Sequence, residues 1–318
     1  MSKSQLSKQQ NRRIQAAQER YRSESELGGE SGLVIARFGK QVLIEEENGD
    51  RRTTTLRRRA EDPVAGDKVV WTPQGEHGVI EALLHSRTII SRPNSQGALR
   101  PIAANIDRLL IVIAPQPLAQ ANLIDRYLVV ASHAGIDASL IVNKADLLSE
   151  APSVVQLAET YSELGVEVVT TGQLSDPGAE TLMDMVATQT VALVGQSGVG
   201  KSSLIKRLLP DLEISIGALS DAVGLGRHTT TAAALYHLPG GGRLIDSPGV
   251  REFHLSHLPK DAIESGFVEF EPLLGLCRFR DCSHSHEVRC AVLEAHERGE
   301  ISSDRLASYR QIVASMSQ

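Results

Sequence analysis

The chain has 318 residues, of which 41% are hydrophobic and 3% aromatic, and its formal net charge is −6. These values are ordinary for a globular protein of two or three domains, and the negative charge argues against a non-specific nucleic-acid binder. No apolar run approaches the roughly 20 residues of a membrane-spanning helix, and the polar N-terminus lacks the apolar core of a secretory signal. We therefore expect a cytoplasmic protein with no membrane contact.

Residues 1–30 form a polar segment with almost no large apolar side chain. Up to residue 22 the basic side chains clearly outnumber the acidic ones: Lys3, Lys8, Arg12, Arg13, Arg20 and Arg22. This composition predicts a flexible basic tail. The alternative is a basic arm that becomes ordered when it binds RNA.

Residues 31–101 predict a small β domain. Short β-prone runs occur at residues 33–35, 41–44, 68–71 and 78–80. The Asn48-Gly49 pair after the second run is typical of a tight turn. Short strands at this spacing favour an OB-fold-like barrel.

One basic cluster lies within this β domain, interleaved with threonines: Arg51, Arg52, Arg57, Arg58 and Arg59. An exposed strand with this charge could bind RNA phosphates. The alternative is a charged edge strand that is merely solvated.

From residue 102 to residue 255, short apolar strands alternate with helices. Strands are predicted at residues 109–113, 140–142, 167–169, 191–194 and 244–245, and helices at 119–134 and 204–209. This alternation predicts a three-layer α/β domain, whose ligands lie at the carboxyl ends of the strands.

The second of these strands ends in Asn143-Lys144-Ala145-Asp146. A carboxylate at Asp146 would accept two hydrogen bonds from guanine, which adenine cannot offer, and the Lys144 stem would cover the base. The next strand ends at residues 170–172, which we expect at the same sheet edge. The alternatives for the segment 143–146 and for the DSPG segment at 246–249 are a surface turn and a helix N-cap.

The fourth strand runs into Gly195-Gln196-Ser197-Gly198-Val199-Gly200-Lys201-Ser202, which matches the phosphate-loop pattern G-x-x-x-x-G-K-[ST]. Its backbone N–H groups would bind phosphate, and Lys201 would reach the β- and γ-phosphates. Ser202 would ligate Mg²⁺, and Ser203 completes the predicted nucleotide-binding segment.

Residues 224–231 are rich in glycine and threonine, as expected for a switch loop. Thr230 or Thr231 would complete the Mg²⁺ shell, and Asp246 would hold the ion through water, while the Gly249 N–H would meet the γ-phosphate. Val250 occupies the position of the water-orienting glutamine of Ras-like enzymes. His228 is the nearest polar candidate for this role; the alternative is a switch-loop histidine that simply packs or binds a partner.

All three cysteines fall within fourteen residues of the C-terminal region 256–318, with a histidine between them. Cys277, Cys282, His284 and Cys290 form a ligand set suited to one structural zinc ion. His286 is the alternative histidine ligand, and three free buried thiols are the competing interpretation. Residues 291–318 predict helices beside this zinc knuckle.

The order of the motifs is circularly permuted, because the NKAD segment precedes the phosphate loop and DSPG (246–249) follows it. With the β domain and the C-x4-C-x-H-x5-C knuckle, the chain resembles the RsgA (YjeQ/YloQ) family of bacterial small-subunit-dependent GTPases. The resemblance implies a late 30S assembly factor whose GTPase activity is stimulated by the small subunit. It also implies that the barrel and the zinc domain contact 16S rRNA.

We therefore expect a GTP hydrolase, monomeric, that uses GTP, Mg²⁺ and one structural Zn²⁺, and whose hydrolysis times its release from the 30S subunit. The alternative is a nucleotide-sensing, ribosome-binding module with little turnover. A large-subunit factor is a third interpretation, but we would not expect such a factor to combine this barrel with this knuckle.

Overall fold

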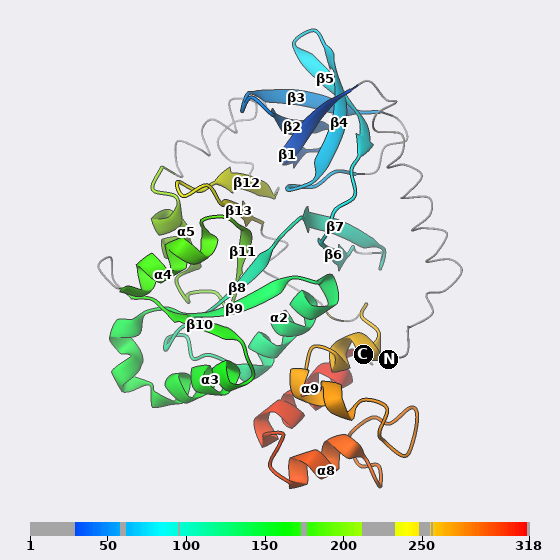
Figure 1. Cartoon of the computed structure of the whole chain (residues 1–318), viewed down its shortest axis with the longest axis vertical. Coiled ribbons are helices and arrows are strands. Elements are labelled where there is room, and N and C mark those ends of the chain that lie inside the picture. Colours follow the sequence, from blue (N-terminus) through cyan, green and yellow to red (C-terminus); the bar gives the residue numbers. More distant parts are fainter. Residues whose placement is uncertain are drawn as a thin grey trace.

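The computed structural model describes residues 29–57, 62–94, 96–172, 177–211, 233–247, 255 and 257–316. The described chain forms a β-barrel, a central sheet flanked by helices, and a C-terminal module, which follow one another along the long axis (Figure 1). Within these ranges, none of the helices has both the length and the apolar character needed to cross a membrane.

The barrel consists of β1 (Glu30–Phe38), β2 (Gln41–Glu46), β3 (Arg51–Leu56), β4 (Lys68–Gln74) and β5 (His77–Leu83). The strands pair in the order β1-β2-β3-β5-β4, and β4 pairs again with β1, so the barrel is closed. Trp71 is fully buried in its core. The predicted OB-like barrel is therefore confirmed.

A hairpin of β6 (Ile89–Pro93) and β7 (Leu99–Ala104) connects the barrel to the central sheet. The sequence analysis did not predict it. Pro93 and Pro101 lie in its strands, and proline lowers the β-propensity of a segment, so the sequence signal is weak.

The central sheet contains β8 (Arg108–Ile113), β9 (Asp137–Val142), β10 (Glu167–Thr170), β11 (Thr190–Val194), β12 (Ala234–His237) and β13 (Arg243–Asp246). The order is β10-β9-β8-β11-β13-β12, parallel throughout except for β12, which is antiparallel to β13. Buried apolar strands of this kind need cover on both faces.

Helices supply that cover. α2 (Ala121–Ala134) and α3 (Pro152–Glu163) lie on one side of the sheet, and α4 (Pro177–Val186) and α5 (Lys201–Leu208) on the other (Figure 1). The predicted three-layer α/β region is therefore confirmed, although α3, α4 and β12 were not predicted. A 3-10 helix, η1 (Ala145–Glu150), follows β9.

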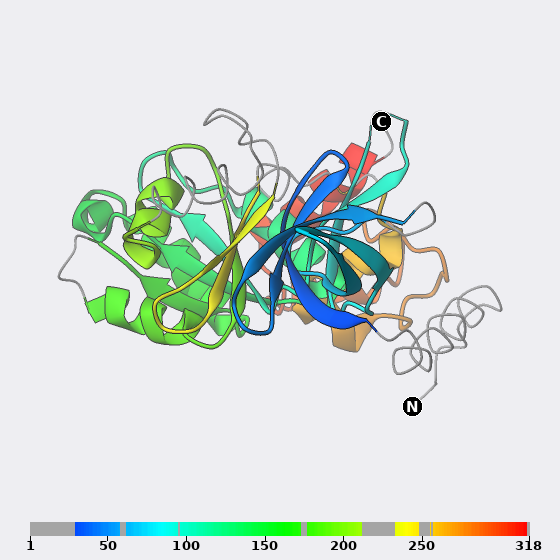
Figure 2. The same ribbon diagram turned by 90° about the horizontal axis from the view of Figure 1, so that it is seen from above.

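Strand β12 also pairs with the barrel, because Ala234 lies opposite Ala36 of β1. The barrel and the central sheet are thus hydrogen-bonded into one continuous sheet, and Figure 2 shows the two side by side from above.

The C-terminal module contains α7 (Lys260–Glu264), the 3-10 helix η3 (Val268–Leu273), α8 (Ala291–Glu297) and α9 (Ser303–Met316). Phe267, Phe270 and Tyr309 are fully buried in its core. The two helices predicted after the cysteines are present. The module packs against α2 through α7 and α9.

Candidate nucleotide site and metal centre

The carboxyl ends of the five parallel strands meet at one edge of the central sheet. Ile113, Val142 and Thr170 lie side by side at the ends of β8, β9 and β10. The β11–β13 register pairs Ala192 with Ile245, so one residue further on, Asp246 lies beside Leu193, just before the phosphate loop. The segments that the sequence predicted to bind nucleotide therefore converge.

The phosphate loop requires glycine at two positions. Gly195 has φ +135°, and a Cβ there would lie 2.2 Å from the Val112 carbonyl oxygen. Gly200 has φ +98°, and a Cβ there would lie 2.2 Å from the Asn143 amide nitrogen. Both positions combine a left-handed backbone with close approach of a neighbour, which only glycine tolerates.

Lys201 is the first residue of α5, and its side chain folds back onto the loop. Its Nζ donates hydrogen bonds to the carbonyl oxygens of Gly195 (2.6 Å) and Gln196 (2.7 Å). Ser202 and Ser203 follow in the first turn of α5 and are exposed. The ammonium and the helix N-terminus thus provide positive charge at the same end of the sheet.

Asn143 connects three loops. Its buried side chain donates a hydrogen bond to the Val199 carbonyl oxygen (2.9 Å) and accepts one from the Thr171 hydroxyl (3.1 Å). The Thr171 carbonyl oxygen also accepts a bond from the Ala145 N–H (3.1 Å). The segment 170–172 is therefore joined to the Asn143 loop, and Thr171, fully buried, positions Asn143.

Lys144 adopts a left-handed backbone, with φ +60°, and its side chain extends to the phosphate loop. The Lys144 Nζ donates to the Gly198 carbonyl oxygen (2.8 Å) and to that of Gln116 (2.6 Å). Sequence reasoning missed Gln116, because backbone acceptors leave no side-chain signal. Asp146 lies exposed in the first turn of η1, accessible to a ligand.

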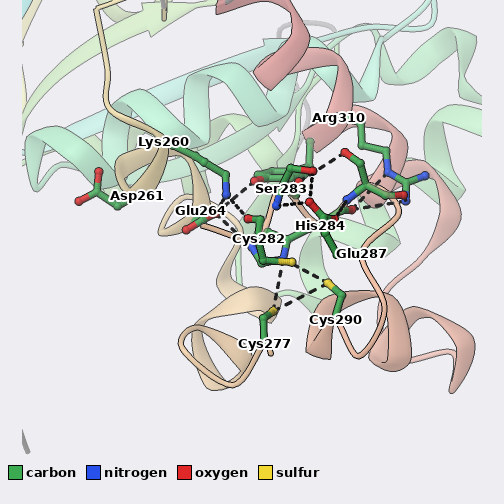
Figure 3. Close-up of polar contacts among 12 residues, drawn as sticks. Lys260, Asp261, Glu264, Cys277, Cys282, Ser283, His284, Glu287, Cys290 and Arg310 are labelled. Atoms are coloured by element: carbon green, nitrogen blue, oxygen red, sulfur yellow. Dashed lines mark hydrogen bonds and ion pairs between the residues drawn. The ribbon is translucent and has the colours of Figure 1, made fainter. Parts of the chain in front are cut away.

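The four predicted zinc ligands form a compact cluster in the C-terminal module (Figure 3). The ligand atoms of Cys277, Cys282, His284 and Cys290 all lie within 4.8 Å of one another. The Cys277 Sγ lies 3.8 Å from the Cys290 Sγ and 3.6 Å from the His284 Nδ1, which in turn lies 3.3 Å from the Cys290 Sγ. Tetrahedral zinc bonds would give separations of about 3.8 Å between sulfurs and about 3.6 Å between sulfur and nitrogen.

The chemistry of the cluster also fits a cation. Burial raises the pKa of the Cys282 thiol to about 12. A positive charge beside the Cys282 sulfur, such as a divalent cation, would compensate this burial and favour its thiolate. His286, the alternative ligand, is exposed and lies outside the cluster.

Glu264 holds the histidine of this cluster in position. Its Oε1 lies 3.1 Å from the His284 Nε2, the ring nitrogen that faces away from the sulfurs, and accepts a bond from Lys260 (2.9 Å). Burial alone would raise the pKa of Glu264, but the bonds to His284 and Lys260 keep it below its usual value. Sequence reasoning missed Glu264, because it lies outside the cysteine segment.

The loop between the ligands is held by Glu287. Its carboxylate accepts hydrogen bonds from the Ser283 N–H (2.7 Å) and hydroxyl (2.5 Å), and from the N–H groups of Ser285 (3.0 Å) and His286 (3.1 Å). These bonds fix the backbone on both sides of His284.

Comparison with known proteins identifies the family. The RsgA GTPase family model matches residues 83–256. A protein of Ectopseudomonas mendocina, named small ribosomal subunit biogenesis GTPase RsgA, is 47% identical over 99% of this chain and 98% of its own length. The chain belongs to the RsgA GTPase family.

Other relatives support this assignment. The protein of the same name from Azotobacter vinelandii is 46% identical over 99% of this chain and 98% of its own. The crystal structure of YjeQ from Thermotoga maritima superimposes with a TM-score of 0.74, at 29% identity, over 90% of this chain and 98% of that one. YloQ, described as a circularly permuted GTPase, shares the fold, with a TM-score of 0.71 over 91% of this chain and 95% of its own, at 23% identity.

Several predicted residues of this RsgA-family chain lie outside the described residues. They are the tail residues 1–28, the barrel residues Arg58 and Arg59, and the switch residues His228, Thr230, Thr231, Gly249 and Val250. Of the predicted Mg²⁺ ligands, Ser202 and Asp246 are described.

The three described arginines of the basic cluster are each paired with a carboxylate of the barrel. Arg51 lies 3.7 Å from Glu45, Arg52 lies 2.6 Å from Glu46, and Arg57 pairs with Glu81. The Arg52 guanidinium also lies 5.1 Å from the centroid of the Trp71 ring. This pairing reduces the net positive charge on which the RNA-binding prediction depends, so that prediction remains a hypothesis.

Proposed function

We propose that this protein hydrolyses GTP as a late assembly factor of the small ribosomal subunit, with hydrolysis stimulated by that subunit and timing its release. The single observation that carries the proposal is the 47% identity, over almost the whole of both chains, to a small ribosomal subunit biogenesis GTPase. The convergence of the phosphate loop, Asn143 and Lys144 at one sheet edge supports it.

In this proposal, each nucleotide-binding segment has one task. Asp146 accepts hydrogen bonds from guanine, and the Lys144 stem covers the base. Residues 195–203 bind the phosphates, Lys201 offsets their charge, and Gly249 meets the γ-phosphate. Ser202, Asp246 and Thr230 or Thr231 would hold Mg²⁺, which would supply positive charge to the transferring phosphate. His228 is the candidate to orient the attacking water.

The metal of the cysteine cluster is proposed to be one zinc ion with a structural role. Three sulfurs and one imidazole complete a tetrahedral shell and leave no position for a reacting water. The Glu264 carboxylate would accept a hydrogen bond from the His284 Nε2 and so fix the orientation of the ring, as carboxylates commonly do in zinc sites.

The proposed partner is the 30S subunit, contacted through 16S rRNA by the domains that flank the GTPase region. We propose a tail at 1–30, a barrel at 31–101, a GTPase domain at 102–255 and a zinc domain at 256–318. The protein would act as a monomer in the cytoplasm, where bacterial ribosomes are assembled, and the arginine cluster 51–59 would contribute RNA contacts.

The decisive experiment is GTP hydrolysis by the purified protein, alone and with equimolar 30S or 50S subunits. We expect a low basal rate that the 30S subunit alone raises by orders of magnitude. Nucleotide-dependent 30S binding without stimulated turnover would instead identify a nucleotide-sensing module, for which the valine at position 250 is the favouring observation. Stimulation by 50S alone would overturn the choice of partner.

A further inference from the structure

Helix α2 belongs to two hydrophobic cores at once. Ile124 and Tyr127 are buried in the core of the GTPase region. Val129 and Val130 are buried in the core of the C-terminal module instead. A helix that serves two cores moves with both of them, because packed interiors do not deform freely.

The face of α2 toward the GTPase region reaches the phosphate loop. Leu123 and Ile124 line a cavity of about 10 Å³ together with Gly195, Gln196 and Val199 of that loop. This volume holds no more than about one water molecule, so the helix and the loop are closely packed. A shift of α2 therefore alters the packing beneath the phosphate site.

The opposite face of α2 bonds to the module along the helix. Asn122 donates to the Ser308 hydroxyl (3.1 Å), Arg126 to the Ser315 hydroxyl (3.1 Å), and Ser132 to the Ser265 carbonyl oxygen (3.3 Å). Gly266 makes the closest approach, since a Cβ there would lie 2.6 Å from the Val129 Cα. The module is therefore tightly packed against this face of α2.

A buried ion pair lies at the centre of this interface. Asp125 of α2 is fully buried, and Arg305 of α9, 3% exposed, pairs with its Oδ1. Arg305 is itself held by Glu269, at 2.6 and 2.8 Å, and its guanidinium lies 4.3 Å from the centroid of the Phe267 ring.

Within the described chain, the charge of Asp125 has no other cationic partner. Its Oδ2 has no hydrogen-bond partner there, whereas its Oδ1 also accepts the Tyr161 hydroxyl, at 2.5 Å, and the neutral Ser308 side chain contributes a further hydrogen bond to the carboxyl group. The same hydroxyl lies 3.1 Å from the carbonyl oxygen of Ala121, the first residue of α2. Removing the Arg305 charge while α9 stays packed on α2 would leave a carboxylate buried without compensation, which is strongly unfavourable.

We propose that α2 couples the C-terminal module to the nucleotide site, with Arg305 as the positioning residue that fixes the helix through Asp125. The coupling rests on the proposed function and deepens it: a partner that displaces the module changes nucleotide affinity, and nucleotide changes the mobility of α9. This reciprocity is required thermodynamically of any coupling between two sites.

The first test measures the affinity of the full-length, zinc-loaded protein for a fluorescent GDP and a non-hydrolysable GTP analogue. Arg305→Gln removes the positive charge that pairs with Asp125. Gly266→Ala inserts a methyl group between the end of α7 and α2. We expect both variants to change nucleotide affinity at least about fivefold, the lower end of typical couplings.

Two control variants separate coupling from general damage. Arg298→Gln removes a half-exposed arginine of the module that pairs with Glu300. Gly240→Ala adds a methyl group at 3.5 Å from its nearest neighbours, an ordinary contact distance. Both controls should leave nucleotide affinity within twofold of the unaltered protein.

Hydrogen exchange on the unaltered protein gives a test that needs no substitution. Saturating nucleotide should slow amide exchange in residues 303–316 of α9 but not in α8. Unchanged α9 exchange in a protein that binds nucleotide normally would overturn the coupling alone. Coupled exchange with unaltered affinity in both variants would overturn the role of Arg305. Failure of the unaltered protein to bind guanine nucleotides would overturn the proposed function as well.

Discussion

The side chain of Asn143 donates a hydrogen bond to the backbone carbonyl oxygen of Val199 over 2.9 Å. One end of the proposed base site is thereby joined directly to the phosphate loop. The two residues are 56 positions apart in the chain, yet each follows a parallel strand of the same sheet. The position of the phosphate loop therefore depends on the base loop before any nucleotide binds.

Replacing Asn143 by alanine should weaken binding of both GDP and GTP by roughly ten- to a hundredfold. The change leaves the buried Val199 carbonyl and the Thr171 hydroxyl without their partner, at a cost of about 1–3 kcal/mol. Titration with fluorescent nucleotide measures the loss. Asn48→Ala, which alters an exposed turn of the barrel, is the matched control. Affinity within twofold of the unaltered protein would show that the connection is unimportant.

Asp146→Asn should change base preference from guanine toward xanthine. An amide in place of the carboxylate cannot accept both guanine hydrogen bonds, whereas it pairs with the additional oxygen of xanthine. Competition of GDP and XDP against a fluorescent nucleotide measures the preference, with Asp137→Asn at the opposite end of the sheet as the control. An unchanged guanine preference would remove Asp146 from the base site.

Glu264→Gln should reduce zinc affinity by about ten- to a hundredfold, the usual effect of losing a carboxylate that orients a histidine ligand. Competition with a chromogenic chelator measures the affinity, and Glu297→Gln, on the exposed side of α8, is the control.

Cys282→Ala should abolish stoichiometric zinc in elemental analysis. Full zinc retention in Cys282→Ala would contradict the ligand assignment.

Arg305→Met should lower the free energy of unfolding by about 3–5 kcal/mol, because Asp125 stays buried without its partner. Asp125→Leu combined with Arg305→Met removes both charges and should recover much of this loss. Urea unfolding of the two single variants and the double variant measures the coupling. Strictly additive losses would mean that the pair does not act as a unit.

The phosphate loop and the NKAD segment could be read from the sequence because each places its chemistry within a few consecutive residues. Gly195, Gly200 and Lys201 share one predicted task, the binding of phosphate, and the apolar run before them identifies a buried strand. The proposed zinc ligands were equally visible, since three cysteines and a histidine within fourteen residues have few other uses. The barrel followed from turn residues between short β-prone runs.

The contacts between these parts could not be read in the same way. Asp125 and Arg305 are 180 residues apart, and in the sequence each looks like an ordinary surface charge on an amphipathic helix. Glu264 is indistinguishable from other helix glutamates until the fold brings it to His284. Similarly, the arginines of the barrel suggested an RNA surface, but the neighbouring strands supply a carboxylate to each described one.

The sequence alone thus determined which ligands we propose, because phosphate, guanine and zinc sites are built from short segments with strict residue requirements. The tertiary structure decided how those sites are connected. Parallel strands bring Asn143, Thr171 and the phosphate loop to one edge, and α2 is shared between two cores. The physical reason is that packing and buried-charge compensation depend on neighbours in space, which a linear pattern does not specify.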